Sequence, residues 1–138
     1  MPHVLKISEA ASLAMHASVM LAANSNRLTS TAEAASALGV SEAHLSKVLQ
    51  RLAHAGLVRA MRGPKGGFAL AKPGSRITLL KVFEAIEGKL MPSSCLLGKR
   101  VCDGTNCILG TLLDTTNRKV REYLAATRLS DLTSVYGR

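Results

Sequence analysis

The sequence has little of what fills most protein cores, and it lacks the marks of a secreted or membrane protein. Its 138 residues include no tryptophan, and aromatic residues make up only 3%. We therefore expect Ala, Leu and Val to pack the core, as in small helical proteins. No apolar run approaches the roughly 18 residues that span a bilayer, and no signal peptide is visible. The number of cysteines is three, and an odd number argues against a secreted disulfide framework. These absences predict a cytoplasmic protein without a membrane segment.

Acidic residues are scarce where basic residues are dense. The formal net charge is +9, and most of the surplus falls between Ser41 and Arg76, where Glu42 is the only acid. Scattered lysines would indicate an ordinary solvated surface, whereas this concentration favours a polyanion partner. The basic residues in this stretch are Lys47, Arg51, Arg59, Arg62, Lys65, Lys72 and Arg76.

The stretch 30–56 predicts two helices separated by a sharp turn. Ser30 and Glu33 fit a capping box at the start of the first helix, and Gly39 suits its left-handed end. Ser41 is placed to cap a second helix, and Gly56 to end it. Apolar residues recur in that second helix at the spacing of a single buried face. They are Leu45, Val48, Leu49 and Leu52.

A short hairpin follows the second helix. Residues 57–61 and 68–71 are expected to form two strands around the Gly- and Pro-containing turn 62–67. A further helix is expected before this region, over residues 7–23, with one face toward the core. Together these elements predict a mainly α fold, a winged helix-turn-helix with a two-stranded β wing. Such a module binds double-stranded DNA.

Candidate DNA-contacting residues lie on the outer face of the second helix and in the hairpin. The first turns of a recognition helix reach base edges in the major groove, and basic hairpin residues beside glycines reach phosphates or the minor groove. Each side chain taken alone is equally compatible with plain solvation. The candidates are Ser41, His44, Lys47, Arg51, Arg62, Lys65 and Gly66.

The C-terminal part predicts a loop between two helices. A helix is expected to start at Thr78 and stop at Gly88, and a long one is expected over residues 108–126, ahead of a short helix or tail. The apolar stripe of that long helix needs a partner surface, so a homodimer is expected. We place a DNA-binding domain at residues 1–88, and a cysteine loop with the dimerisation helix at 89–138.

The loop holds all three cysteines, spaced C-x6-C-x4-C. Thiolates are soft ligands that suit zinc and iron–sulfur clusters. Cys95, Cys102 and Cys107 could converge on one metal centre, although three unrelated buried cysteines remain an alternative. No histidine occurs after His54, so a fourth ligand must come from elsewhere in the chain or from a dimer partner. No base accompanies the thiols, so we expect neither an enzyme nor a small-molecule substrate.

Three segments together resemble the bacterial Rrf-type regulator family, which includes NsrR and IscR. They are HLSKVLQRLAHAGLVRAMRGPKGGFALA at 44–71, the following TLLKVFEAIEG, and three cysteines before a long helix. The resemblance covers essentially the full length. It implies a homodimer with crossing C-terminal helices and an iron–sulfur cluster near the partner's first helix. In NsrR-like members an acidic residue early in that helix completes the coordination, a position that falls on Glu9.

The sequence also departs from the family pattern. The middle cysteine is displaced by one position from the spacing common in NsrR and IscR, and the IscR-type histidine after the third cysteine is absent. The sequence therefore does not distinguish between a 2Fe-2S and a 4Fe-4S cluster.

The expected function is a transcriptional regulator, a repressor, whose DNA affinity depends on an iron–sulfur cluster that responds to redox state, nitric oxide or iron supply. Two alternatives keep DNA binding but replace the cluster, either by a structural zinc site or by a thiol-based sensor. A small electron-transfer protein is disfavoured, because it has no need of a recognition helix.

Overall fold

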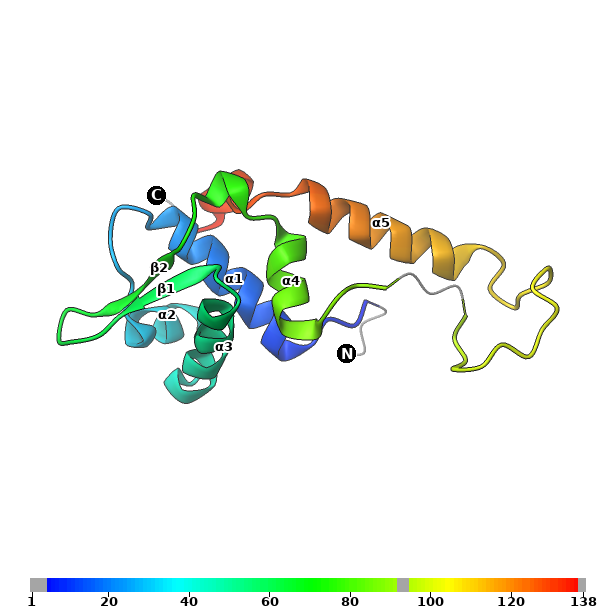
Figure 1. Ribbon diagram of the computed structural model, residues 1–138, viewed down its shortest axis with the longest axis horizontal. Helices are drawn as coiled ribbons and strands as arrows, with labels where there is room; N and C mark the ends of the chain where they lie inside the picture. Colours follow the sequence, from blue (N-terminus) through cyan, green and yellow to red (C-terminus); the bar gives the residue numbers. More distant parts are fainter. Residues whose placement is uncertain (1–4, 92–94, 137–138) are drawn as a thin grey trace.

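The computed structural model describes residues 5–91 and 95–136, and within them the chain is mainly helical with one two-stranded antiparallel sheet (Figure 1). The predicted fold class, a winged helix-turn-helix followed by a cysteine loop and a long helix, is confirmed. The regular elements are α1 (Glu9–Ala23), α2 (Thr31–Leu38), α3 (Glu42–His54), β1 (Val58–Met61), β2 (Gly67–Leu70), η1 (Gly74–Arg76), α4 (Leu79–Glu87), α5 (Leu112–Ala126) and η2 (Leu129–Val135), where η marks 3₁₀ helices.

Helix α1 is the centre of the core. We predicted one buried face, but every residue from Ala17 to Ala22 is buried, so this prediction was too narrow. The reason is that α3, α4, β2 and η2 all contact α1 and enclose it from several sides. Small side chains such as Ala14 and Ala17, which are 0% and 1% exposed, let these neighbours approach closely. The expected core of Ala, Leu and Val is confirmed.

Caps fix the helix-turn-helix as the sequence predicted. The hydroxyl of Ser30 accepts the Glu33 N–H at 3.1 Å, and that of Ser41 accepts the His44 N–H at 3.1 Å. Gly39 has φ 69°, the left-handed conformation that ends α2. One detail was wrong. The Glu33 carboxylate does not return to the Ser30 backbone as in a full capping box, because it pairs with Arg27.

The wing is anchored to the linker before α2. Strands β1 and β2 pair from Val58 with Leu70 to Met61 with Gly67. Thr29 adds a bridge to Phe68, with backbone N–H···O distances of 2.9 and 2.8 Å in the two directions. This third segment ties the hairpin to the start of the helix-turn-helix, so the wing and α2 are held in a fixed relation.

The long C-terminal helix begins later than predicted. Residues 108–111 form turns, and α5 starts at Leu112 instead of residue 108. Gly110 has φ 60°, and this left-handed residue interrupts the helical path. Within α5, Leu124 is the buried residue, while Leu112 and Tyr123 are 61% and 58% exposed. Much of the predicted apolar stripe therefore faces outward.

After α5 the chain returns to the body of the protein. The Leu79 N–H donates to the Thr127 carbonyl at 2.9 Å, and the Leu129 N–H donates to the Ile77 carbonyl at 2.9 Å. Leu129 is 0% exposed, and η2 packs on α1. One end of α5 is thereby fixed to the core, whereas the cysteine loop lies beyond its other end (Figure 1). The division into domains at residue 88 stays a prediction.

In the parts of the chain that the structure describes, no helix has the length and apolar character needed to cross a membrane.

Candidate nucleic-acid interface and cysteine pocket

The residues of α3 that we predicted to contact DNA bases lie on one surface of the helix. Its apolar stripe is buried, with Leu45 and Leu52 0% exposed, so the opposite face is left to solvent. Ser41 and Lys47 are exposed, and His44 is half-buried. The imidazole Nδ1 of His44 lies 3.8 Å from Oε1 of Glu9 at the start of α1. The DNA-contacting roles of these residues stay predictions.

Arg51 has an intramolecular partner that the sequence did not reveal. Its guanidinium Nη2 donates to the carbonyl of Ile86 in the last turn of α4, at 2.5 Å. A cation at a helix C-terminus also interacts favourably with the helix dipole. Arg51 therefore joins the recognition helix to α4, in addition to its predicted role at DNA.

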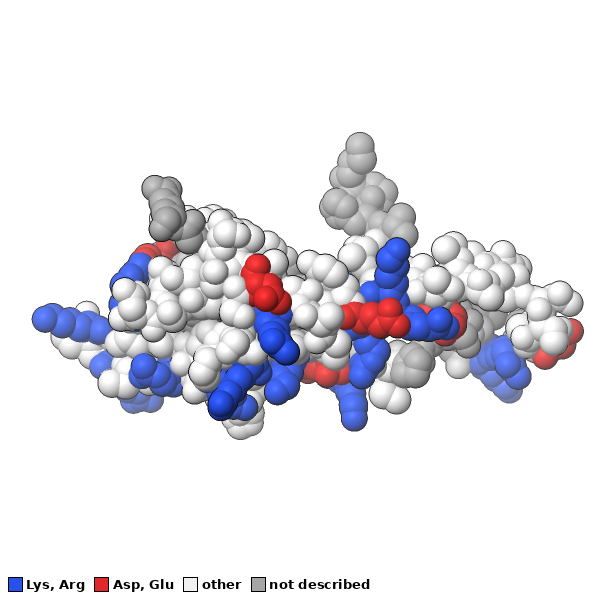
Figure 2. All heavy atoms as spheres, turned by 90° about the horizontal axis from the view of Figure 1, so that it is seen from above, with Lys and Arg blue, Asp and Glu red and all other residues white. Residues whose placement is uncertain are grey.

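The wing carries its basic residues at an exposed tip. Arg62 and Lys65 are exposed, and Figure 2 shows Lys and Arg side chains at the wing end of the molecule and along the neighbouring edge. Gly66 is required by space, since a Cβ there would lie 2.2 Å from the Met61 carbonyl oxygen. A groove of about 630 Å³ separates the wing from the helices, and its walls include Thr31 of α2 and Gln50 of α3. The shape and the charge both suit a nucleic-acid backbone.

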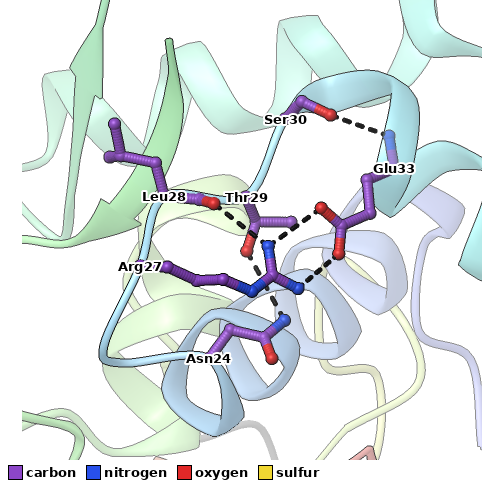
Figure 3. A network of polar contacts seen from close by, with 6 residues as sticks. All are labelled: Asn24, Arg27, Leu28, Thr29, Ser30 and Glu33. Carbon is purple, nitrogen blue, oxygen red and sulfur yellow. Dashed lines mark hydrogen bonds and ion pairs between the residues drawn. The ribbon is translucent and has the colours of Figure 1, made fainter. Parts of the chain in front are cut away.

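A polar network fixes the start of α2 beside this groove (Figure 3). Arg27 pairs with Glu33 through two parallel bonds, Nη1 to Oε1 at 3.0 Å and Nη2 to Oε2 at 2.5 Å. The same guanidinium donates to the Leu28 carbonyl at 3.1 Å, and the Asn24 amide donates to the Thr29 hydroxyl at 3.5 Å. The guanidinium hydrogen bonds lower the pKa of Glu33, and the carboxylate raises the pKa of Arg27.

The Glu33 pair predicts a pH-dependent contribution to stability. A carboxyl whose folded pKa is lowered stabilises the fold above its unfolded pKa, and this stabilisation is lost as the pH falls through the folded pKa. Because the pair is exposed, Glu33→Gln should lower the midpoint of thermal unfolding at pH 7 by only about 1–3 °C. The difference from wild type should vanish once the pH has fallen below the lowered folded pKa of Glu33. Glu122→Gln, an exposed carboxylate on α5, is the matched control. A difference that persists unchanged at low pH would show that the ion pair is not its source.

The three cysteines surround one pocket. Cys95, Cys102 and Cys107 all line a cavity of about 150 Å³, with apolar walls that include Leu109 and Leu113 next to the start of α5. Cys95 is half-buried and the other two are exposed, and none of these three described cysteines is in a disulfide. The Leu97 N–H lies 3.4 Å from Cys95 Sγ. The loop thus places three cysteines around one small, mainly apolar space.

The three cysteines line one pocket, but they do not converge on a single point. Among the described residues, no three Cys, His, Asp or Glu side chains converge closely enough to hold a metal ion. Glu9 is not among the residues that line the cysteine pocket; it lies beside His44. The predicted fourth ligand and the three thiols are therefore separate within one chain.

An aspartate turn shapes the loop between the second and third cysteines. The Asp103 carboxylate accepts the Thr105 N–H and hydroxyl, both at 2.8 Å, and the Asn106 N–H at 3.2 Å. These hydrogen bonds lower the pKa of Asp103. We did not single out this residue from the sequence, although Asp-Gly followed by polar residues is a recognised turn signal.

The entrance to the cysteine loop is also held by side chains that the sequence reading missed. The Glu84 carboxylate of α4 accepts the Leu90 N–H at 2.7 Å, and Arg121 of α5 donates to the Leu90 carbonyl at 3.2 Å. Nearby, the Ser8 hydroxyl that caps α1 donates to Glu87 at the end of α4. No local motif identifies such contacts, because each joins residues that are far apart or have no fixed spacing.

Comparisons with known proteins agree with this architecture. The model of the Rrf2 family, described as an iron-dependent transcriptional regulator, matches residues 7–134. A protein of Neisseria meningitidis serogroup A, named as an HTH-type transcriptional regulator, is 30% identical over 93 residues. That match covers 67% of this chain and 63% of the Neisseria protein, so the chain aligns with less than two thirds of that relative.

Two longer matches cover nearly the whole chain. The HTH-type transcriptional regulator IscR of Cereibacter sphaeroides is 33% identical over 138 aligned positions, covering 93% of this chain and 86% of IscR. The solved structure of CymR, the global cysteine regulator of Bacillus subtilis, superposes with a TM-score of 0.80 at 28% identity, covering 96% of this chain and 98% of CymR. The chain therefore belongs to the Rrf2 family, whose members are transcriptional regulators and not enzymes, as the sequence predicted.

Proposed function

We propose that this regulator binds operator DNA as a homodimer in the bacterial cytoplasm, and that an iron–sulfur cluster held by its cysteine loop controls its affinity. The observation that carries the proposal is the cysteine pocket, where Cys95, Cys102 and Cys107 face one small cavity. The family description as an iron-dependent regulator supports it.

The DNA-binding part rests on the exposed face of α3, the basic wing and the groove between them. Ser41, His44 and Lys47 are proposed to read bases, while Arg62 and Lys65 are proposed to contact phosphates beside the backbone of Gly66. The exposed apolar residues of α5, among them Leu112 and Tyr123, support pairing with a second copy of the chain. Dimers present two recognition helices to two half-sites.

The donors fit the proposed cofactor in kind. Thiolates are the usual ligands of iron–sulfur clusters, most often four of them, and three line this pocket together with apolar side chains. A bound cluster supplies an oxidisable centre whose loss or oxidation alters the loop that holds it. Cys95, Cys102 and Cys107 would hold it within one chain, and Glu9 of the second chain is the proposed fourth ligand.

A second candidate is a sensor that uses the thiols without a cluster. The lack of three converging ligands among the described residues favours it, as does the exposure of Cys102 and Cys107. The solved relative CymR is named as a cysteine regulator. In this case the thiols themselves would be the chemically modified groups.

Anaerobic purification of the full chain tests these alternatives. We expect a coloured protein with iron and acid-labile sulfide in comparable amounts, and a different affinity for its best duplex, selected from a random pool, after the cluster is removed by chelation. Zinc with no visible absorbance would instead support a structural metal site. Metal-free protein that still binds the duplex and loses binding on thiol oxidation would support the thiol sensor.

A further inference from the structure

The C-terminal end of α4 contacts both α3 and the start of the cysteine loop, which are the two elements that the proposed function must connect. On one side, Arg51 of α3 donates to the Ile86 carbonyl at 2.5 Å. On the other side, Glu84 accepts the Leu90 N–H at 2.7 Å, and Leu90 stands five residues before Cys95 in the sequence. The contact with the recognition helix and the contact with the cysteine loop are therefore only two residues apart on α4.

A second clamp holds the same point from α5. Arg121 Nη1 donates to the Leu90 carbonyl at 3.2 Å and lies 3.9 Å from Oε2 of Glu84. The two side chains thus hold both polar groups of the Leu90 peptide backbone. The Glu84 side chain is only 24% exposed, so its hydrogen bond is partly shielded from competing water.

We propose that Glu84 is a positioning residue that couples the cysteine loop to the recognition helix. The inference rests on the proposed function, in which the cysteine loop is the sensing element. A change in the loop that pulls on Leu90 acts on the carboxylate of Glu84 and so on the last turn of α4. The Ile86 carbonyl in that turn carries the displacement to Arg51 and α3. Arg121 keeps the Leu90 backbone in the position where Glu84 can bind it.

Within one chain, the separation of the cysteine loop from the DNA-reading surface favours this route. The cysteine loop lies at one end of the molecule and the wing at the other, with the body of the protein between them (Figure 1). The described residues of the loop therefore lie apart from the wing, and we expect coupling within one chain to pass through packed elements with discrete arrangements. Two hydrogen bonds, Leu90 to Glu84 and Arg51 to Ile86, are joined by the last turn of α4 and form a path from the start of the loop to α3.

Reciprocal linkage allows a test on protein without a cluster. If the loop changes DNA affinity, DNA must change the equilibrium of the loop by the same factor. The rates at which iodoacetamide alkylates Cys102 and Cys107 report the state of the loop. They are measured by mass spectrometry on the cluster-free full chain, with and without a saturating amount of its best duplex from a random pool. We expect the duplex to change these rates about 5- to 20-fold in wild type.

Glu84→Gln and Arg121→Gln should each reduce this ratio to about twofold or less, with Tm and secondary structure checked for each variant. Glu122→Gln, next to Arg121 on α5 and also a loss of one charge, should keep the wild-type ratio. A wild-type ratio in both Glu84→Gln and Arg121→Gln would overturn the proposal, as would an unchanged alkylation rate in wild type. Absence of iron and sulfide from anaerobic protein would count against the cluster alone, so the two failures are distinguishable.

Discussion

Replacing Cys102 by alanine is expected to remove the cluster. Cys102 is one of three thiols around a pocket of about 150 Å³, and a methyl group cannot act as a ligand. Two cysteines and one carboxylate would leave one iron of the cluster without a protein thiolate and open to solvent. Anaerobically purified Cys102→Ala should therefore contain about tenfold less iron and sulfide than wild type, and it should lack visible absorbance.

Two comparisons make this result specific. Thr105→Ala changes the same exposed loop and removes one hydroxyl contact to Asp103, but it leaves all thiols, so it should retain the cluster. Glu9→Gln should still assemble one, because the three thiols remain. The Glu9 carboxylate is a harder donor than a thiolate and is proposed to hold the fourth position. Its loss should leave that position open, so we expect the cluster of Glu9→Gln to decay faster in air than the wild-type cluster. Wild-type iron and sulfide in Cys102→Ala would exclude the pocket as the cluster site.

The DNA-binding fold could be predicted because its signals are local. Ser30, Gly39 and Ser41 each specify a cap within a few residues, and those caps are present. The apolar period of α3 likewise gave its buried face. Such patterns depend on helix geometry alone and need no knowledge of the rest of the chain.

The errors came from features that apolar periodicity and cap spacing do not contain. Helical periodicity continued through 108–111, yet Gly110 at φ 60° delays the start of α5. Glu33 has the capping-box spacing, but Arg27 offers a charged partner and takes its carboxylate. A bidentate ion pair of this kind is stronger than a bond to a neutral N–H.

The site was predictable in its residue types but not in its connections. Clustered cysteines and basic residues can be read from spacing and composition. The bond from Arg51 to Ile86 and the clamp of Glu84 and Arg121 on Leu90 depend on how α3, α4 and α5 pack. No periodic signal encodes such contacts, because they are set only when the core brings the helices together.

A single methyl group in the wing is expected to weaken DNA binding strongly. In Gly66→Ala the new Cβ would lie 2.2 Å from the Met61 carbonyl oxygen and 2.9 Å from that of Gly63. Both are backbone atoms, so the turn itself must move. Because Arg62 and Lys65 stand on this turn, their phosphate contacts should be lost together. We expect affinity at low salt to fall about 10- to 100-fold, and the log–log salt slope to decrease by up to about 1.8, or about 0.9 for each lost contact.

Binding is measured by fluorescence anisotropy on the cluster-free protein, so the result does not depend on the cofactor. Gly98→Ala is the matched control, because a Cβ there meets nothing within 4 Å and its φ is not positive. Its affinity and slope should equal those of wild type. The Tm of Gly66→Ala should stay within a few degrees of wild type, since the core on α1 is far from the wing tip (Figure 1). An unchanged salt slope in a folded Gly66→Ala protein would show that the wing does not contact the DNA backbone, and the basic surface of α3 would then have to supply the phosphate contacts.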